Sequence, residues 1–214
     1  MPEPSVKRVV AFFDAQNLFH AVKNVFNHMH PDYDPLALAN AICVARKGWE
    51  LSQARLYTGG PDAKDDPFWN HYWNGKLAVL GRQGVHVFRR ALRYRMKVVK
   101  LPREDKFGAM AGKKHKFLVG EEKGVDVRIA IDIIRLAHLR QYDVALVFSQ
   151  DQDLSEVADE IRAVAEEQKR WIKIACAFPS GEASRNRRGI DKTDWIEISR
   201  EMYEECMDLR DYKP

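Results

Sequence analysis

The stretch "VFSQDQDLSEV", residues 147–157, places Asp151 and Asp153 one residue apart directly after an apolar run. Asp14 ends a second apolar run, "RVVAFFD", and Asp126 follows a glycine at the start of a further apolar segment. The carboxyl ends of parallel strands meet at one rim of a sheet. We therefore expect Asp14, Asp151 and Asp153 at one rim, joined by Asp126 if its helix begins there.

Carboxylates held close together repel one another, which raises their pKa values unless a cation lies among them. Oxygen ligands of this type select hard divalent ions, so the sequence predicts bound Mg²⁺ or Mn²⁺. Such an ion activates water for attack on a phosphodiester and stabilises the leaving oxygen. The chemistry expected of this rim is that of a metal-dependent nuclease.

Each aspartate also has a purely structural interpretation. Asp151 or Asp153 alone suits a helix N-cap or first turn, and Asp126 suits a first-turn charge. Asp14 suits the start of a turn, with Asn17 capping the next helix. Their shared position in an alternating pattern favours the metal site, because independent caps would not need to fall at the same end of the sheet.

Strands and helices alternate along the chain, which predicts a parallel sheet with helices on both faces. A polar, glycine-containing segment at 102–122 is expected to be a mobile loop. Strands are expected at 8–14, 50–60, 85–101, 142–151, 171–178 and 194–199. Helices are expected at 15–26, 34–48, 65–84, 123–141, 154–168 and near the C-terminus.

The predicted helix at 123–141 is apolar on nearly every side, so we expect it to be packed inside the protein. Asp132 on this helix is left out of the site. Arg128 and Arg135 stand at i−4 and i+3 from it, where they suit ordinary ion pairs on a helix surface.

The size and composition of the chain favour one soluble domain spanning residues 1–214. Its 214 residues are 45% hydrophobic and 31% charged, and no apolar stretch approaches the roughly 20 residues that cross a bilayer. The N-terminus lacks a small-residue cleavage site, so we expect a cytoplasmic protein. Cys43, Cys176 and Cys206 show no zinc-type spacing and are expected to be buried thiols.

Positive charge is concentrated in a basic segment at about 89–122. Residues 89–116 hold eleven lysines and arginines against two acidic residues, although the whole chain carries a net charge of only +4. This segment suits contact with a phosphate backbone, and its interleaved aromatic residues suit stacking on unpaired bases. A solvated strand face and loop is the alternative. The expected contacts are Arg93, Arg95, Lys113, Lys114 and Lys116.

Three motifs in the chain resemble those of NYN domains, a PIN-like ribonuclease group that includes the LabA-type proteins. They are "VVAFFDAQNL", "EEKGVDVRIAIDII" and "YDVALVFSQDQDLSEVADEI". The resemblance covers about residues 9–198, and its middle motif is the most specific. It implies a Rossmann-like three-layer α/β/α fold with a mostly parallel central sheet, and an endonuclease site that uses Mg²⁺ or Mn²⁺ and acts on RNA.

The resemblance also implies residue roles. Gln150 and Leu154 stand where the family usually has Gly and Phe, and Ala15 stands where Gly is usual. These departures bear on the shape of the loops around the site and on substrate choice. By motif, the metal-site carboxylates are Asp14, Asp126, Asp151 and Asp153, Asn17 is the neighbour of the first, and Lys123 is placed to meet a phosphate.

An aromatic set in "FWNHYW" has two interpretations: its members bury helix surface, or they contact a partner or a base. The set comprises Phe68, Trp69, Tyr72 and Trp73. The sequence contains no GxSxG, P-loop or GxGxxG pattern, so the usual serine hydrolase, nucleoside triphosphate and dinucleotide signatures are absent.

The function expected from the sequence is a metal-dependent endoribonuclease that acts on single-stranded or structured RNA. The alternative is an RNA-binding regulatory module with a weak or inactive nuclease site. A phosphatase or a structure-specific DNA nuclease is a third interpretation of the same acidic rim. No membrane partner is expected, and the sequence leaves open whether the chain forms a homodimer.

Overall fold

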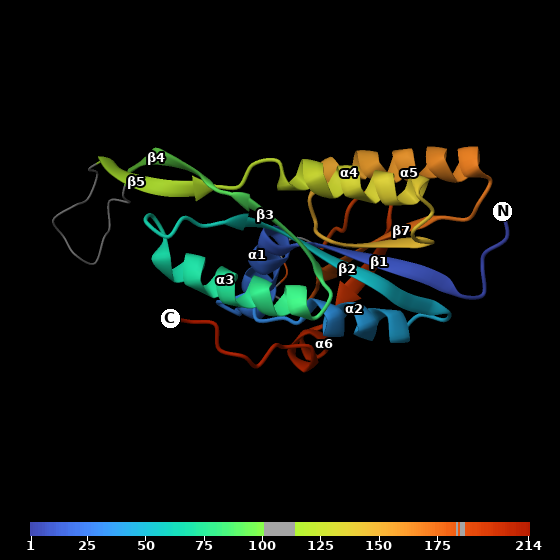
Figure 1. Ribbon diagram of the computed structural model, residues 1–214, viewed down its shortest axis with the longest axis horizontal. Coiled ribbons are helices and arrows are strands. Elements are labelled where there is room, and N and C mark those ends of the chain that lie inside the picture. The colour runs from blue at the N-terminus through green and yellow to red at the C-terminus, as the bar shows by residue number, and fades with distance from the viewer. Residues whose placement is uncertain (101–113, 183, 185–186) are drawn as a thin grey trace.

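Six strands form a sheet in the order β3-β2-β1-β6-β7-β8, and every neighbouring pair in it is parallel (Figure 1). The computed structural model describes residues 1–100, 114–182, 184 and 187–214. The parallel sheet predicted from the alternating pattern is confirmed. Its strands are β1 (Lys7–Asp14), β2 (Trp49–Gly60), β3 (His86–Ala91), β6 (Val144–Phe148), β7 (Lys173–Pro179) and β8 (Asp194–Ile198).

Helices cover both faces of this sheet, so the chain has the Rossmann-like three-layer α/β/α fold. Two hydrophobic clusters, one on each face, hold the layers together. The first face carries α1 (Ala15–Phe26), α2 (Pro35–Val44), α3 (Pro67–Arg82) and α6 (Arg200–Glu205). The second face carries α4 (Val125–His138) and α5 (Ser155–Gln168), which lie side by side in Figure 1.

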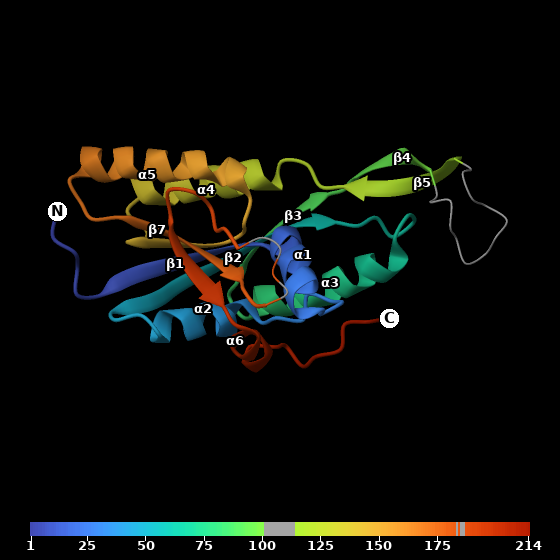
Figure 2. The ribbon, with the colours of Figure 1, turned by 180° about the vertical axis from the view of Figure 1, so that it is seen from behind.

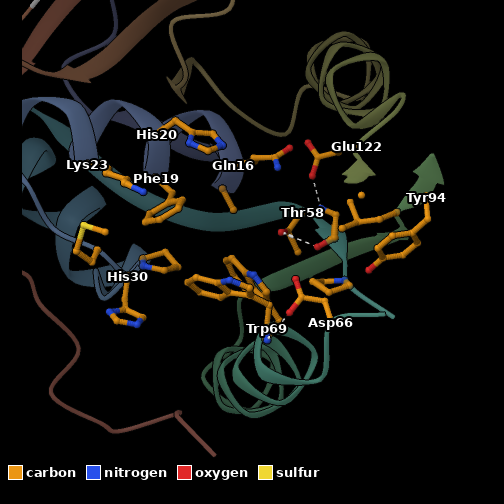
Figure 3. A pocket seen from close by; sticks show the side chains of 18 residues that line it. Gln16, Phe19, His20, Lys23, His30, Thr58, Asp66, Trp69, Tyr94 and Glu122 are labelled. Carbon is orange, nitrogen blue, oxygen red and sulfur yellow. Dashed lines mark hydrogen bonds between the residues drawn. The ribbon is translucent and has the colours of Figure 1, made fainter. Parts of the chain in front are cut away.

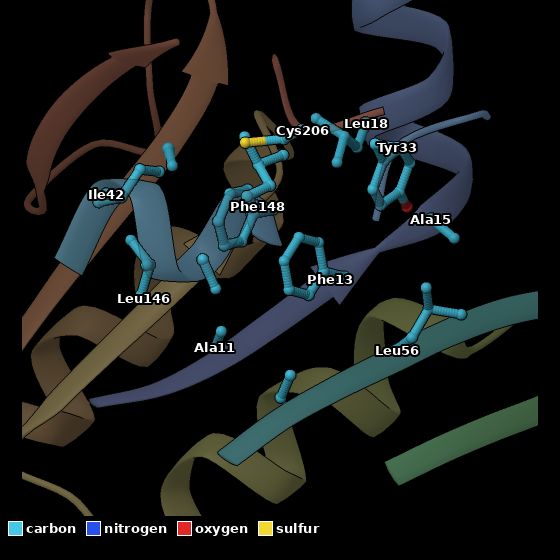
Figure 4. Close-up of a cluster of buried hydrophobic side chains, with 14 of the residues drawn as sticks. Ala11, Phe13, Ala15, Leu18, Tyr33, Ile42, Leu56, Leu146, Phe148 and Cys206 are labelled. Atoms are coloured by element: carbon cyan, nitrogen blue, oxygen red, sulfur yellow. The ribbon is translucent and has the colours of Figure 1, made fainter. Parts of the chain in front are cut away.

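Strand β1 contributes to both clusters because successive side chains of a strand point to opposite faces. Ala11 and Phe13 belong to the first cluster, where Figure 4 shows Phe13 among side chains from the helices and from β6. Val10 and Phe12 belong to the second. A central strand buried on both faces must be apolar throughout, which explains the continuous run "VVAFF".

The strand order reverses between β1 and β6. From β1 the chain passes outward to β2 and β3, and it then returns to the other side of β1 with β6 and passes outward again to β8. The helices after β1 cover the first face, whereas α5 after β6 covers the second. Connections that leave a sheet on opposite faces open a crevice at the carboxyl ends of the two strands.

Beyond this sheet, β4 (Arg93–Lys100) and β5 (Lys114–Glu121) form a two-stranded antiparallel hairpin. It extends away from the sheet and its helices (Figure 1 and Figure 2). The expected mobile loop at 102–122 is therefore wrong for 114–121, where backbone pairing with β4 overrides a polar, glycine-containing local sequence. Residues 101–113, including Lys113, lie outside the described residues.

The expectation that α4, which is apolar on nearly every side, is packed inside the protein is also wrong. Val125, Ile129 and Ile133 are buried, but Val127 is 56% exposed and Ile131 is 51% exposed. The helix lies on the sheet with one face and against α5 with its flank, which leaves its outer face in solvent. The three cysteines are buried free thiols, as predicted.

None of the helices within the described ranges combines the length and apolar character needed to cross a membrane. The single-domain organisation and the cytoplasmic location stay predictions.

Asp132 is not a surface residue, contrary to the expectation. It is 3% exposed and faces the sheet, where its carboxylate accepts hydrogen bonds from Tyr57 Oη at 2.8 Å and Arg55 Nη2 at 3.2 Å. Arg128 Nη2 lies 2.9 Å from the same carboxylate, so only this half of the expected helix pairing is present among the described contacts. The network ties α4 to β2 and thereby fixes the helix that carries Asp126.

Replacing Asp132 by alanine should destabilise the protein by about 3–5 kcal/mol, because two arginines and a tyrosine would lose a buried partner. Urea unfolding of Asp132→Ala beside the parent protein measures the change. Asp159→Ala is the matched control, since Asp159 is an exposed helical aspartate with two cationic partners. Equal losses in the two variants would contradict a structural role for the buried network.

Candidate functional site

Asp14 is the last residue of β1 and also the N-cap of α1. Its Oδ1 accepts the Asn17 backbone N–H at 3.1 Å, and its Oδ2 accepts the Ser149 hydroxyl at 3.3 Å. The side chain is almost fully enclosed, with 5% of the residue exposed. Asp14 therefore takes the capping role that the sequence assigned to Asn17, and it does so at the crevice between β1 and β6.

The segment after β6, which carries Asp151 and Asp153, is held in place by hydrogen bonds. The Asp151 N–H donates to Ser149 Oγ at 3.1 Å, and the Asp151 carboxylate accepts the Asp153 N–H at 3.1 Å as the cap of a 3₁₀ turn. The Gln150 N–H donates to Asn17 Oδ1 at 2.9 Å. Asn17, expected to contact substrate, thus connects α1 to this segment and sets its position.

Asp126 lies in the first turn of α4 and reaches the same crevice. The helix begins after Gly124, whose φ of +73° lies in the left-handed region that favours glycine. Arg90 Nη1 donates to the Gly124 carbonyl at 3.3 Å, and a Cβ at this position would lie 2.7 Å from Arg90 Nη1. The end of β3 and a glycine therefore set where α4 starts.

These elements bring the predicted aspartates together. One ligand oxygen from each of Asp126, Asp151 and Asp153 lies within 4.8 Å of the others. Asp14 lies beside them, and with Asp126 and Asp151 it lines a cavity of about 420 Å³, here called the carboxylate cavity. Asp153 is exposed and does not line this cavity. The other lining residues are Gln16, Asn17, His20, Glu122, Lys123, Gly124 and Val125.

Burial is the main cause that raises the pKa of Asp14 to about 6, and the negative charges of Asp151 and Asp126 contribute to this rise. The hydrogen bonds from Asn17 and Ser149 act in the opposite direction. A buried carboxyl among other carboxyls is thus costly to ionise near neutral pH. A cation bound among these oxygens would remove that cost.

Glu122 is a further carboxylate in this cavity that sequence reasoning missed. Burial and, to a smaller extent, the charges of Asp14 and Asp126 together raise its pKa to about 7. The Gly59 N–H donates to Glu122 Oε2, and a Cβ on Gly59 would lie 2.7 Å from that oxygen. The only signal in the sequence was "EEKG", which ends two residues before Asp126, because the contact with β2 is not local.

The donors in this cluster fit a hard divalent ion. The three clustered groups are all carboxylates, which suit Mg²⁺ or Mn²⁺ rather than a softer metal. Lys123 lines the same cavity with an exposed side chain, at the position expected for a phosphate contact.

The predicted basic contacts on the hairpin do not form one patch. In the register of β4 and β5, Arg93 and Arg95 share a face with Glu121, and Arg95 Nε lies 3.8 Å from the Glu121 carboxylate. Lys116 pairs with Val98 and lies on the opposite face. Lys114 belongs to β5, but its side chain lies outside the description, as does all of Lys113.

The family model of the NYN domain matches residues 8–184 of this chain. No curated protein matches this chain.

Among solved structures, a Vibrio parahaemolyticus protein of unknown function is 15% identical with a TM-score of 0.49, over 100% of this chain and 99% of that chain. A phosphofructokinase-2 mutant from Escherichia coli is 13% identical with a TM-score of 0.31, over 69% and 43% of the two chains. Acinetobacter baumannii MurG is 11% identical with a TM-score of 0.32, over 89% and 45%. Likenesses at these scores carry no argument about function.

Replacing Asp14 by asparagine should stabilise the metal-free protein at alkaline pH, because asparagine still caps α1 but cannot ionise. A pKa of about 6, above the ordinary 3.8, means that the stability contributed by Asp14 is present below about pH 4 and lost as the pH rises through 6. Between about pH 4 and about pH 8, the free energy of unfolding of the parent should therefore fall by up to about 3 kcal/mol more than that of Asp14→Asn.

Unfolding in urea with EDTA, repeated across this pH range, measures the difference. Asp34→Asn makes the same exchange at the N-cap of α2 and controls for the loss of a capping charge. Parallel pH curves for the parent and Asp14→Asn would contradict the assigned pKa.

Proposed function

Because the chain belongs to the NYN domain family, whose fold is the PIN-like nuclease fold, we propose that it is a metal-dependent endoribonuclease. The observation that carries this proposal is the meeting of Asp126, Asp151 and Asp153 within 4.8 Å. These residues come from the start of α4 and from the segment after β6, so only the fold brings them together. Helix capping alone would not require that convergence.

A divalent ion bound by these carboxylates would lower the pKa of a water and stabilise negative charge on a phosphodiester. Asp126, Asp151 and Asp153 are the residues that would hold it, with Asp14 beside them. Backbone N–H groups orient the carboxylates of Asp14 and Asp151, and the Ser149 hydroxyl also donates to Asp14. The site is thus preorganised by the ends of β1 and β6.

Glu122 supplies the protein's own proton acceptor in this proposal. Its pKa of about 7 lets it take up or release a proton near neutral pH, where an ordinary glutamate is fully ionised. It lines the same cavity as Asp14 and Asp126, so a proton leaving an attacking water has an acceptor at hand. The hydrogen bond from Gly59 holds its carboxylate in place.

Cationic side chains would hold the RNA backbone. Lys123 lines the carboxylate cavity, and Arg93 and Arg95 are exposed on one face of the hairpin. Their charges suit successive phosphates of a strand that leaves the cavity along the hairpin. RNA is the partner class that this arrangement and the family favour.

Replacing Asp126 by asparagine should lower cleavage of RNA by at least about 100-fold, because even residues that support a metal ligand contribute 10- to 100-fold. The measurement is the rate at which labelled single-stranded RNA is cut in Mg²⁺, in Mn²⁺ and in EDTA. Asp159→Asn, an exposed aspartate on α5, is the matched control and should cut like the parent.

An Asp126→Asn protein that still cuts at the parent rate would contradict the proposed site and indicate a contaminating nuclease. If neither protein cuts RNA but both retard it on a gel, the chain is instead an RNA-binding module with an inactive site. Competition with DNA and with small phosphoesters separates the remaining alternatives, a DNA nuclease and a phosphatase.

Replacing Arg93 by alanine should weaken RNA binding similarly for all sequences and lower its dependence on salt. Each lost phosphate contact reduces the slope of log affinity against log salt by about 0.7 for a single strand. Arg46→Ala is the control, since Arg46 is exposed just before β2, at the opposite end of the sheet. An unchanged slope in Arg93→Ala would show that the hairpin does not contact the backbone.

A further inference from the structure

A second cavity, shown in Figure 3, has a volume of about 510 Å³ and shares lining residues with the carboxylate cavity. Gln16, His20 and Glu122 line both cavities. The second cavity lies between α1 and α3, with the end of β2 and the base of the hairpin completing its wall. It is called the aromatic cavity here, after Phe19, Trp69, Trp73 and Tyr94, which line it.

The aromatic cavity presents partly exposed ring faces from different elements. Phe19 comes from α1 and Trp69 from α3, and their ring centroids lie 6.0 Å apart. His30 lies 5.6 Å from Trp69. Trp69 thus lies against both Phe19 and His30, and all three side chains are half-buried, so they still offer surface to a ligand.

These rings are held in place by the protein. The Tyr94 hydroxyl accepts the Asp62 N–H at 2.8 Å, which fastens the hairpin to the segment after β2. Asp66 accepts the Trp69 backbone N–H at 3.3 Å as the N-cap of α3, which fixes the start of the helix that carries Trp69. A flat ligand would therefore enter a site whose walls need little ordering, which favours binding.

Polar and charged groups around the rings suit the edge of a nucleobase and its phosphate. Within the described part of the chain the Gln16 amide has no hydrogen-bond partner, and it offers both a donor and an acceptor at the boundary of the two cavities. Lys23 lines the aromatic cavity, and Lys123 lines the carboxylate cavity. An apolar protein side chain would use the rings but not these groups.

We propose that the aromatic cavity receives one unpaired nucleobase of the RNA whose adjoining phosphodiester lies in the carboxylate cavity. A base is joined to its own phosphate through a single ribose, so a base site must adjoin the phosphate site, as the shared wall allows. A base inside a duplex is stacked on both faces and cannot enter. The substrate class is therefore single-stranded RNA or an unpaired loop, a conclusion that rests on the proposed function.

The test measures binding rather than cleavage, so the Asp126→Asn protein is used throughout in Mg²⁺. The probe is a set of short single-stranded oligoribonucleotides, each lacking the base at one position. Removing the base that enters the cavity should weaken binding roughly 5- to 100-fold, the range found when one base–aromatic stack is lost. Trp69→Leu should weaken binding of the intact strand to a similar extent.

The two changes should not add, because both remove the same contact. Phe68→Leu is the matched control: Phe68 is the neighbour of Trp69 on α3, is 37% exposed and does not line the cavity. Phe19→Leu provides a second variant should Trp69→Leu prove unfolded by circular dichroism. The same strand annealed to its complement should lose the dependence on Trp69.

The proposal would be overturned if Trp69→Leu lowered the binding affinity equally for every abasic strand. It would also be overturned if duplex and single strand depended on Trp69 to the same extent. Absence of RNA binding would also overturn it. The outcomes for the two proposals are separable. If the effects of the missing base and of Trp69→Leu do not add and the parent protein does not cut RNA, the base site is supported and the nuclease proposal is contradicted. If the parent protein cuts RNA and the two effects add, the nuclease proposal is supported and the base site is contradicted.

Discussion

Repulsion between like charges is the constraint on which the rest of this structure depends. Several carboxylates meet at the ends of β1 and β6, and burial makes the ionised form of Asp14 unfavourable. The protein opposes the repulsion with fixed dipoles, since backbone N–H groups and the Ser149 hydroxyl donate to the carboxylates. Farther along α4, the buried pairing of Asp132 with arginines holds the helix on the sheet. The stability contributed by this buried network thus allows the fold to hold carboxylates unfavourably close together at the rim of the sheet.

The fold and the meeting of the aspartates were predictable because both follow from local periodicity. A continuous apolar run that ends in a carboxylate marks a central parallel strand and its carboxyl end, and two such runs place Asp14 and Asp151 in one crevice. The position of Asp126 followed from the glycine before a helix. Each of these signals lies within a few residues of the feature that it predicts.

The features that were missed depend on contacts between distant segments. Glu122 enters the site because the hairpin ends beside Gly59, and no local pattern indicates that. Residues 114–121 form a strand only through pairing with β4. Asp132 lies between arginines on its helix as a surface residue would, yet two of its partners, Arg55 and Tyr57, come from β2. The number of charged residues likewise could not show that Lys116 lies on the other face of the hairpin from Arg93 and Arg95.

The alternation of β1 between two hydrophobic clusters restricts how the chain can vary in length. Insertion or deletion of one residue within this strand would exchange the side chains of the two clusters and turn the following aspartate to the wrong face. The hairpin of β4 and β5 pairs only with itself among the described strands, so its length can change without moving the sheet. Changes in length should therefore be tolerated in the hairpin and not at the centre of the sheet.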